Sequence, residues 1–113
     1  MSRSTFSGPV KSTNGVIVGS DGTQITKILK GTVSVDPASL ADAAEADTSI
    51  TITGAALGDT VILNPPAAGL TAGILICGAW VSAANTVKVR LANASGGTVD
   101  EAAGTWSYCL IRA

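Results

Sequence analysis

The sequence predicts an all-β protein, an antiparallel β-sandwich or jelly-roll-like domain with an extended N-terminal arm. Short segments alternate large apolar and polar residues with a period of two, which is typical of strands with one buried face. Clusters of glycine, proline and asparagine separate these segments. Helical propensity is confined to one stretch, residues 37–47, so we expect a fold of about six to eight strands.

The arm is assigned to residues 1–24 and the sandwich domain to residues 25–113. The arm is rich in serine, threonine, glycine and asparagine and has turn signals at Asn14-Gly15 and elsewhere. An arm with an apolar segment often adds to the surface or sheet edge of a neighbour, and the alternative of equal weight is a frayed terminus. Its candidate contact residues are Phe6, Val16, Ile17 and Val18.

The first half of the domain is expected to hold three strands. In residues 25–36, Leu29, Gly31, Val33 and Val35 share one face, and Asp36-Pro37 ends the strand because proline cannot continue a ladder. Residues 37–47 are either a turn of helix or a surface linker. Further strands are expected at residues 48–53 and 60–63.

The second half contains the strongest hairpin signal. Strands at residues 74–81 and 86–91 flank a connection over residues 82–85, and Asn85 suits the left-handed position that ends such a loop. In the second strand Lys88 and Arg90 alternate with valines, so we expect them to face solvent or an interface. The last strand spans residues 105–111, with Trp106, Tyr108 and Leu110 on one face.

The composition favours a subunit of an assembly over a monomer with a neutral polar surface. Charged residues make up 13% of the chain, against about 25% in average soluble proteins. The net charge is −1 and no basic stripe is present, so nucleic acid is not an expected partner. No signal-peptide pattern is seen, and the longest apolar run, residues 74–81, is far shorter than the ~20 residues of a membrane span. We therefore expect synthesis in a cytoplasm and no membrane insertion.

Residues suited to catalysis or metal binding are few. There is no histidine, which removes the commonest general base and metal ligand. Cys77 and Cys109 lie in apolar strands and are expected to be buried thiols. The carboxylates lie at turns and in one linker, and the spacing of Asp42, Glu45 and Asp47 matches no calcium loop. We therefore expect no enzyme, metal or cofactor, and keep a small hydrolase as a remote alternative.

The aromatic residues are candidates for contacts between subunits. Trp80, Trp106 and Tyr108 occupy strand positions, where aromatic side chains are usually core or interface anchors. The alternative is a platform on which sugar rings stack.

Three segments resemble small structural proteins of tailed bacteriophages. They are Gly54-Ala-Ala-Leu-Gly-Asp-Thr-Val-Ile-Leu-Asn-Pro-Pro66, Gly78-Ala-Trp-Val-Ser-Ala-Ala-Asn-Thr-Val-Lys-Val-Arg-Leu-Ala-Asn93 and Gly104-Thr-Trp-Ser-Tyr108. The resemblance implies a virion subunit, assembled in the host cytoplasm, that works by surface contact. No individual functional residue carries over.

Together, the resemblance and the composition lead us to expect a capsid decoration, or cement, protein on the outer head surface. Its expected partners are the major capsid protein and further copies of itself, and the resemblance implies a trimer. The alternative within the virion is a head-fibre, tail-fibre or receptor-binding module that holds a host glycan.

Overall fold

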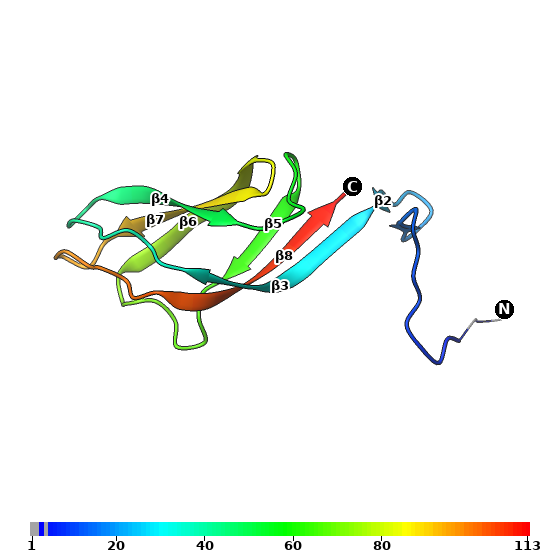
Figure 1. Ribbon diagram of the computed structural model, residues 1–113, viewed down its shortest axis with the longest axis horizontal. Helices are drawn as coiled ribbons and strands as arrows, with labels where there is room; N and C mark the ends of the chain where they lie inside the picture. Colours follow the sequence, from blue (N-terminus) through cyan, green and yellow to red (C-terminus); the bar gives the residue numbers. More distant parts are fainter. Residues whose placement is uncertain (1–2, 4) are drawn as a thin grey trace.

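The computed structural model describes residues 3 and 5–113, and these residues form eight β-strands and no helix. All strand pairs are antiparallel, so the predicted all-β class is confirmed (Figure 1). The strands are β1 (Val16–Ile17), β2 (Gln24–Ile25), β3 (Lys27–Val35), β4 (Glu45–Thr51), β5 (Thr60–Asn64), β6 (Ile74–Ala83), β7 (Thr86–Asn93) and β8 (Gly104–Arg112).

Six of these strands form the two sheets of a sandwich. One sheet has the order β3-β8-β5 and the other β4-β7-β6. Along the chain from β3 to β8, each loop between consecutive strands crosses from one sheet to the other, except the turn of the β6–β7 hairpin. The buried core draws side chains from both sheets, with Trp106 and Leu110 from one and Ile50, Val87 and Leu91 from the other.

The alternation predicted for the first strand is confirmed in β3. Leu29, Val33 and Val35 pack on or into the core, whereas Lys30, Thr32 and Ser34 are exposed on the other face. Gly31 lies opposite Tyr108 in the register of β3 with β8. A Cβ atom at position 31 would lie 2.7 Å from the Tyr108 hydroxyl oxygen, so the glycine makes room for the phenol ring.

The linker after β3 has no helix, which settles the open choice for residues 37–47. Leu40 forms an isolated antiparallel bridge with Val99, and β4 begins at Glu45 rather than at the expected Thr48. Asn93 explains why this linker is extended. Its buried side-chain amide donates to the carbonyls of Leu40 and Ala41, at 3.0 and 3.2 Å, and so ties the linker to the end of β7.

The β6–β7 hairpin has a shorter loop than expected. Ser82 and Ala83 extend β6 through a bulge, so the turn consists of Ala84 and Asn85 alone. Asn85 has φ of 61°, in the left-handed region predicted for it. Its Oδ1 accepts a hydrogen bond from the Gly54 N–H at 2.8 Å, which joins this turn to the segment after β4.

The N-terminal segment, residues 3 and 5–26, lies outside both sheets and extends the molecule lengthwise (Figure 1). The sequence predicted an extended arm over residues 1–24, of which residues 1, 2 and 4 lie outside the described part. Within the N-terminal segment, β1 and β2 form a small separate hairpin. The radius of gyration is 17.8 Å, against about 13 Å for a compact domain of this length.

Candidate functional site

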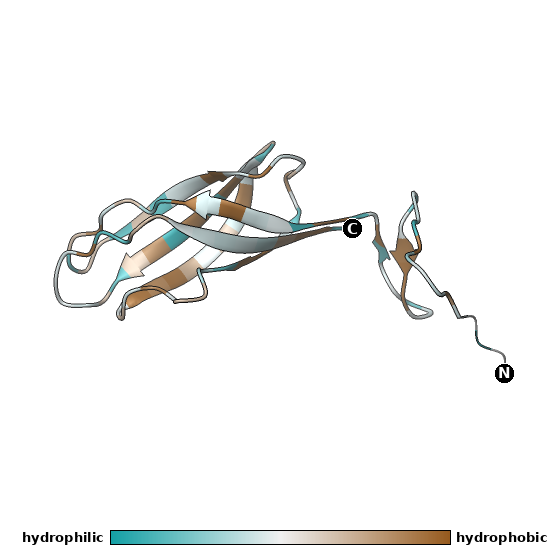
Figure 2. Cartoon of the chain, turned by 60° about the horizontal axis from the view of Figure 1, so that its bottom comes forward, coloured by the Kyte–Doolittle hydropathy of each residue, from teal (hydrophilic) through white to brown (hydrophobic). Residues whose placement is uncertain are grey.

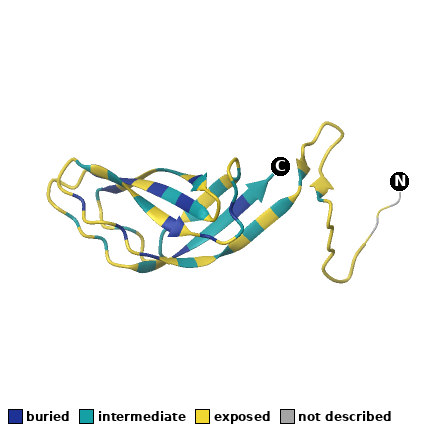
Figure 3. Ribbon diagram, turned by 45° about the horizontal axis from the view of Figure 1, so that its top comes forward, coloured by how far each residue is buried: buried dark blue, intermediate teal, exposed yellow. Residues whose placement is uncertain are grey.

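Exposed apolar side chains gather at the N-terminal end of the molecule. Eleven large apolar side chains are exposed in the described part of the chain, and six of them lie between Phe6 and Ile28. Figure 3 shows the N-terminal segment almost wholly exposed, and Figure 2 shows hydrophobic residues on its hairpin. Contiguous exposed apolar side chains are typical of contact sites, so this group is a candidate contact surface. The four candidate contact residues of the arm, Phe6, Val16, Ile17 and Val18, all belong to this group.

A groove lies between the N-terminal hairpin and the start of β3. Its volume is about 660 Å³, and its lining includes Val10, Val18 and Ile28 together with Lys11 and Lys27. The groove therefore offers apolar surface with positive charge at its margin. Such a lining suits a partner segment that carries both apolar side chains and carboxylates.

Hydrogen bonds hold the walls of this groove. The Ser12 hydroxyl donates to the Gly15 carbonyl at 2.7 Å, and the Gln24 side-chain amide donates to the Asn14 carbonyl. The Thr26 N–H donates to the Arg112 carbonyl at 2.8 Å, which links the segment to the last strand of the sandwich. An isolated two-stranded hairpin is marginally stable in water, so a partner that covers the groove would order it further.

An apolar strip continues from the groove across the outer face of the β3-β8-β5 sheet. Ile28 lies opposite Ile111, and Cys109 lies opposite Ile62. Ile28 is 62% exposed and Ile62 49%, and the side chains between them are half-buried. We call these four residues the apolar strip. Period-two alternation puts Ile28 on the face of its strand opposite Leu29 and Val33, and an isoleucine on that mostly polar face is the sequence signal for this surface.

The outer face of the β4-β7-β6 sheet is different, because its middle carries charges. The Arg90 guanidinium donates to both carboxylate oxygens of Asp47, at 2.7 and 3.2 Å. It also lies 5.2 Å from the centre of the Trp80 ring, within range of a cation–π contact. The hydrogen bond from Arg90 lowers the pKa of Asp47. The Arg90 side chain is 45% exposed, so its predicted outward orientation is confirmed.

The three aromatic candidates have different locations. Trp80 is 37% exposed on the charged face and is available to a partner. Tyr108 is half-buried and packs against the core. Trp106 is 1% exposed in the core, so its assignment as a subunit-interface candidate is wrong for this fold. The core takes it because it lies on the inner face of the middle strand, β8, with strands on both sides.

The prediction of two buried thiols is also wrong. Cys77 is exposed and Cys109 is half-buried. Cys77 sits at a β-bulge in the edge strand β6, where the alternation of faces is interrupted. Cys109 faces outward because its neighbours in β8, Tyr108 and Leu110, face the core. The two thiols therefore lie on different sheets.

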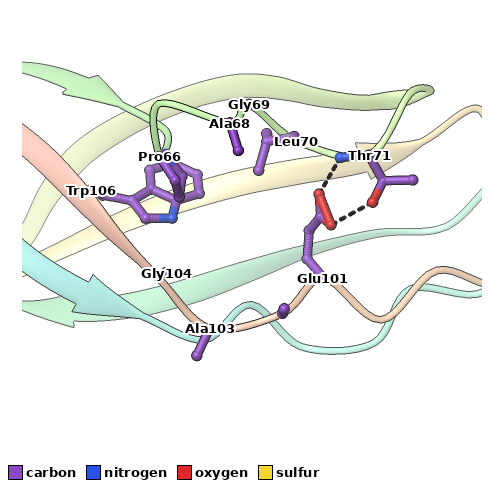
Figure 4. A pocket seen from close by; sticks show the side chains of 10 residues that line it. Pro66, Ala68, Gly69, Leu70, Thr71, Glu101, Ala103, Gly104 and Trp106 are labelled. Atoms are coloured by element: carbon purple, nitrogen blue, oxygen red, sulfur yellow. Dashed lines mark hydrogen bonds between the residues drawn. The ribbon is translucent and has the colours of Figure 1, made fainter.

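A second pocket lies at the other end of the sandwich, between the loop after β5 and the loop before β8 (Figure 4). Its volume is about 400 Å³. Glu101, its one charged lining residue, accepts hydrogen bonds from the Thr71 N–H and from the Thr71 hydroxyl, the latter at 2.7 Å. Both of its carboxylate oxygens thus have partners within the chain, and the pair acts as a tie between two loops.

The one strongly shifted carboxylate also has a structural role. The side chain of Asp59 is 2% exposed and accepts two hydrogen bonds from Arg112, at 2.8 and 2.9 Å. These bonds, together with the N–H of Ala56, lower the pKa of Asp59 to about 2. Arg112 also donates to the Gly54 carbonyl at 2.8 Å. The pair fastens the end of β8 to the loop before β5.

The described residues contain no group of three or more histidine, cysteine, aspartate or glutamate side chains placed to hold a metal ion. No helix long and apolar enough to cross a membrane occurs among them. Comparisons with protein-family models, with curated proteins and with solved structures found no match to this chain. The surfaces described above are therefore the basis of the functional argument.

Proposed function

We propose that this chain is a structural protein of a bacteriophage virion, a decoration protein that binds the outer surface of the head and stabilises the shell. The observation that carries the proposal is the apolar N-terminal segment, which projects from a well-packed sandwich and whose large apolar side chains from Phe6 to Val18 are each more than half exposed. The virion setting comes from the resemblance of residues 54–66, 78–93 and 104–108 to phage structural proteins.

The mechanism is mass action. A protein that binds the assembled shell, and not its free subunits, lowers the free energy of the assembled state. The sandwich supplies a rigid body, and the N-terminal segment supplies apolar contact area. If the segment orders fully when it docks, part of the binding free energy is used for that ordering.

An add-back experiment on purified heads tests this function. Heads stripped of the protein are heated with and without the purified full chain, and release of the genome is followed with a DNA-binding dye. We expect the release temperature to rise with protein concentration and to level off when the sites are filled. The proposal fails if the chain does not bind the heads, or if saturated heads are no more heat-resistant than stripped ones.

A fibre or receptor-binding module is the second candidate, and the exposed Trp80 ring favours it. A tryptophan that is 37% exposed beside Arg90 can stack on a sugar ring. Immunogold labelling of intact virions separates the two candidates. Label over the faces of the head supports the decoration protein, and label confined to tail tips or fibres supports the receptor-binding module.

A further inference from the structure

Charge is divided unequally between the two parts of the chain. Residues 3–30 contain four basic side chains and one acidic side chain, whereas residues 31–113 contain three basic and seven acidic ones. The net charge of −1 is therefore the sum of +3 for the N-terminal part, residues 3–30, and −4 for the remainder, residues 31–113. The basic residues of the N-terminal part are Arg3, Lys11, Lys27 and Lys30, and its acid is Asp21.

The basic residues of the N-terminal part and most of the acidic residues of the remainder also lie toward opposite ends of an elongated molecule. The chain measures 60 × 28 × 24 Å. The N-terminal segment lies at one end, and the loops after β3 and before β8 lie at the other (Figure 1). Five carboxylates come from these distal loops and the start of β4: Asp36, Asp42, Glu45, Asp100 and Glu101. The distal end is thus acidic, and the end that carries the exposed apolar side chains is basic.

The apolar surface at the N-terminal end also extends along one side of the molecule. Ile28 lines the groove and also begins the apolar strip, so the two surfaces are continuous. The opposite outer face carries the Asp47–Arg90 pair, from β4 and the central strand β7, and Lys88, also from β7. The apolar strip is therefore continuous with the groove, whereas the exposed apolar side chains of the opposite side, Leu75 and Trp80, lie on its edge strand β6 and do not line the groove.

We infer that the groove and the apolar strip form one docking surface, and that its partner is a protein face whose apolar side chains are flanked by carboxylates. The inference rests on the proposed function and specifies the chemistry of the site on the shell and the side of the molecule that meets it. Lys11 is exposed beside the groove, so a carboxylate on the partner reaches it without displacing an internal partner. Basic side chains here are too few and too interspersed with valine and isoleucine to track a phosphate backbone.

The two cysteines provide a footprint of the docked side. Cys109 lies in the apolar strip, and Cys77 lies on the other sheet. The full chain, free and bound to stripped heads, is treated with iodoacetamide, and alkylation of each thiol is followed by mass spectrometry. We expect head binding to slow alkylation of Cys109 by about 10-fold or more, because reactivity follows access, and to leave Cys77 unchanged. Protection of Cys77 with Cys109 still reactive would overturn the inference and leave the proposed function standing.

Two matched pairs of variants test the partner's chemistry through binding to the same heads. Lys11→Glu reverses a charge at the groove, and Lys88→Glu makes the same change on the opposite face. We expect K11E to weaken binding about 3- to 10-fold at low salt, and K88E to bind like the unmodified chain. The difference between them should shrink in 0.5 M NaCl because salt screens exposed charges. Ile28→Ser and Leu75→Ser form the apolar pair, both at exposed strand positions, and only I28S should weaken binding.

The outcomes separate the two levels of the proposal. Heads that bind all four variants equally would overturn the docking surface while the decoration function stands. Failure of the unmodified chain to bind heads would overturn both. Competition of head binding by duplex DNA would replace the acidic protein face with nucleic acid. Concentration-dependent growth of the purified chain in light scattering, abolished by K11E, would replace it with the acidic end of a second copy.

Discussion

Replacement of Asn93 tests most sharply how the distal end of the sandwich is held together. Asn93 is 2% exposed. Its amide nitrogen contacts the carbonyls of Leu40, Ala41 and Gly97 at 3.0, 3.2 and 2.7 Å. Its oxygen accepts from the Ser95 N–H at 2.9 Å and from the Ser95 hydroxyl at 2.6 Å. One side chain thus ties the linker after β3 to the turn after β7.

Two substitutions separate the loss of these hydrogen bonds from the replacement of a hydrogen-bond donor by an acceptor. Asn93→Ala removes the side-chain partner of three carbonyls and of Ser95. With about 0.5–1.5 kcal/mol for each hydrogen bond and a penalty for buried groups left unpaired, we expect a loss of about 2–4 kcal/mol in the free energy of unfolding. Asn93→Asp keeps the shape but points a buried carboxylate at carbonyl oxygens, so we expect it to cost more than N93A.

Thermal and urea unfolding measure both effects. A loss of 2–4 kcal/mol corresponds to a decrease of roughly 8–17 °C in Tm for a chain of this length. Asn64→Ala is the matched control, because Asn64 is exposed at the end of β5, and it should change the free energy of unfolding by less than about 0.5 kcal/mol. If N93A is as stable as N64A, or if N93D is more stable than N93A, the reasoning about this hydrogen-bond centre is refuted.

Three further predictions concern acid stability and two turns. Folding lowers the pKa of Asp59 from 3.8 to about 2, so the ionised carboxylate stabilises the fold above pH 4 and this stabilisation is lost as the pH falls towards 2. Between pH 6 and pH 2, the Tm of Asp59→Asn should therefore fall less steeply than the Tm of the unmodified chain. Equal slopes would contradict this. Asn85→Ala should cost about 1–2.5 kcal/mol in urea unfolding and Asn85→Gly less, since glycine keeps the φ of 61°. Ala43 also has φ of 61°, so Ala43→Gly should leave Tm unchanged or raise it by a few degrees, and a clear decrease would show that the turn is not strained.

Much of the sandwich was predictable because its strands alternate with a period of two. The inner faces of β3 and β8 follow directly from Leu29, Val33, Trp106 and Leu110. Asn85 predicted the left-handed turn, since asparagine tolerates the left-handed backbone region that this position adopts. Local pattern and tertiary packing agree at these positions, and short-range reasoning therefore succeeds.

Other features depend on long-range contacts that a linear pattern does not contain. The start of β4 and the form of the linker before it depend on Asn93, more than fifty residues away from Leu40. The exposure of Cys77 follows from a bulge, which shifts the register at one residue and cannot be seen from composition. The burial of Trp106 depends on the position of β8 between β3 and β5. A side-chain hydrogen bond, a local register shift and the order of strands in a sheet decide these three outcomes.

The candidate surface was predictable in part. Phe6, Val16, Ile17 and Val18 stood out because apolar residues interrupt a polar stretch, and all four are exposed. The apolar strip was not assembled in advance, because Ile28, Ile62 and Ile111 come from three strands whose register only the fold supplies. The separation of charge between the two ends likewise has meaning only once the ends are known.

Quantitative mass spectrometry of purified virions tests the central claim most directly. Labelled peptides of this chain and of the major shell protein, added as internal standards, give the ratio of the two proteins in the particle. A decoration protein should be present at a copy number comparable to that of the shell protein. The account is contradicted if the chain is absent from purified particles or present at only a few copies per virion.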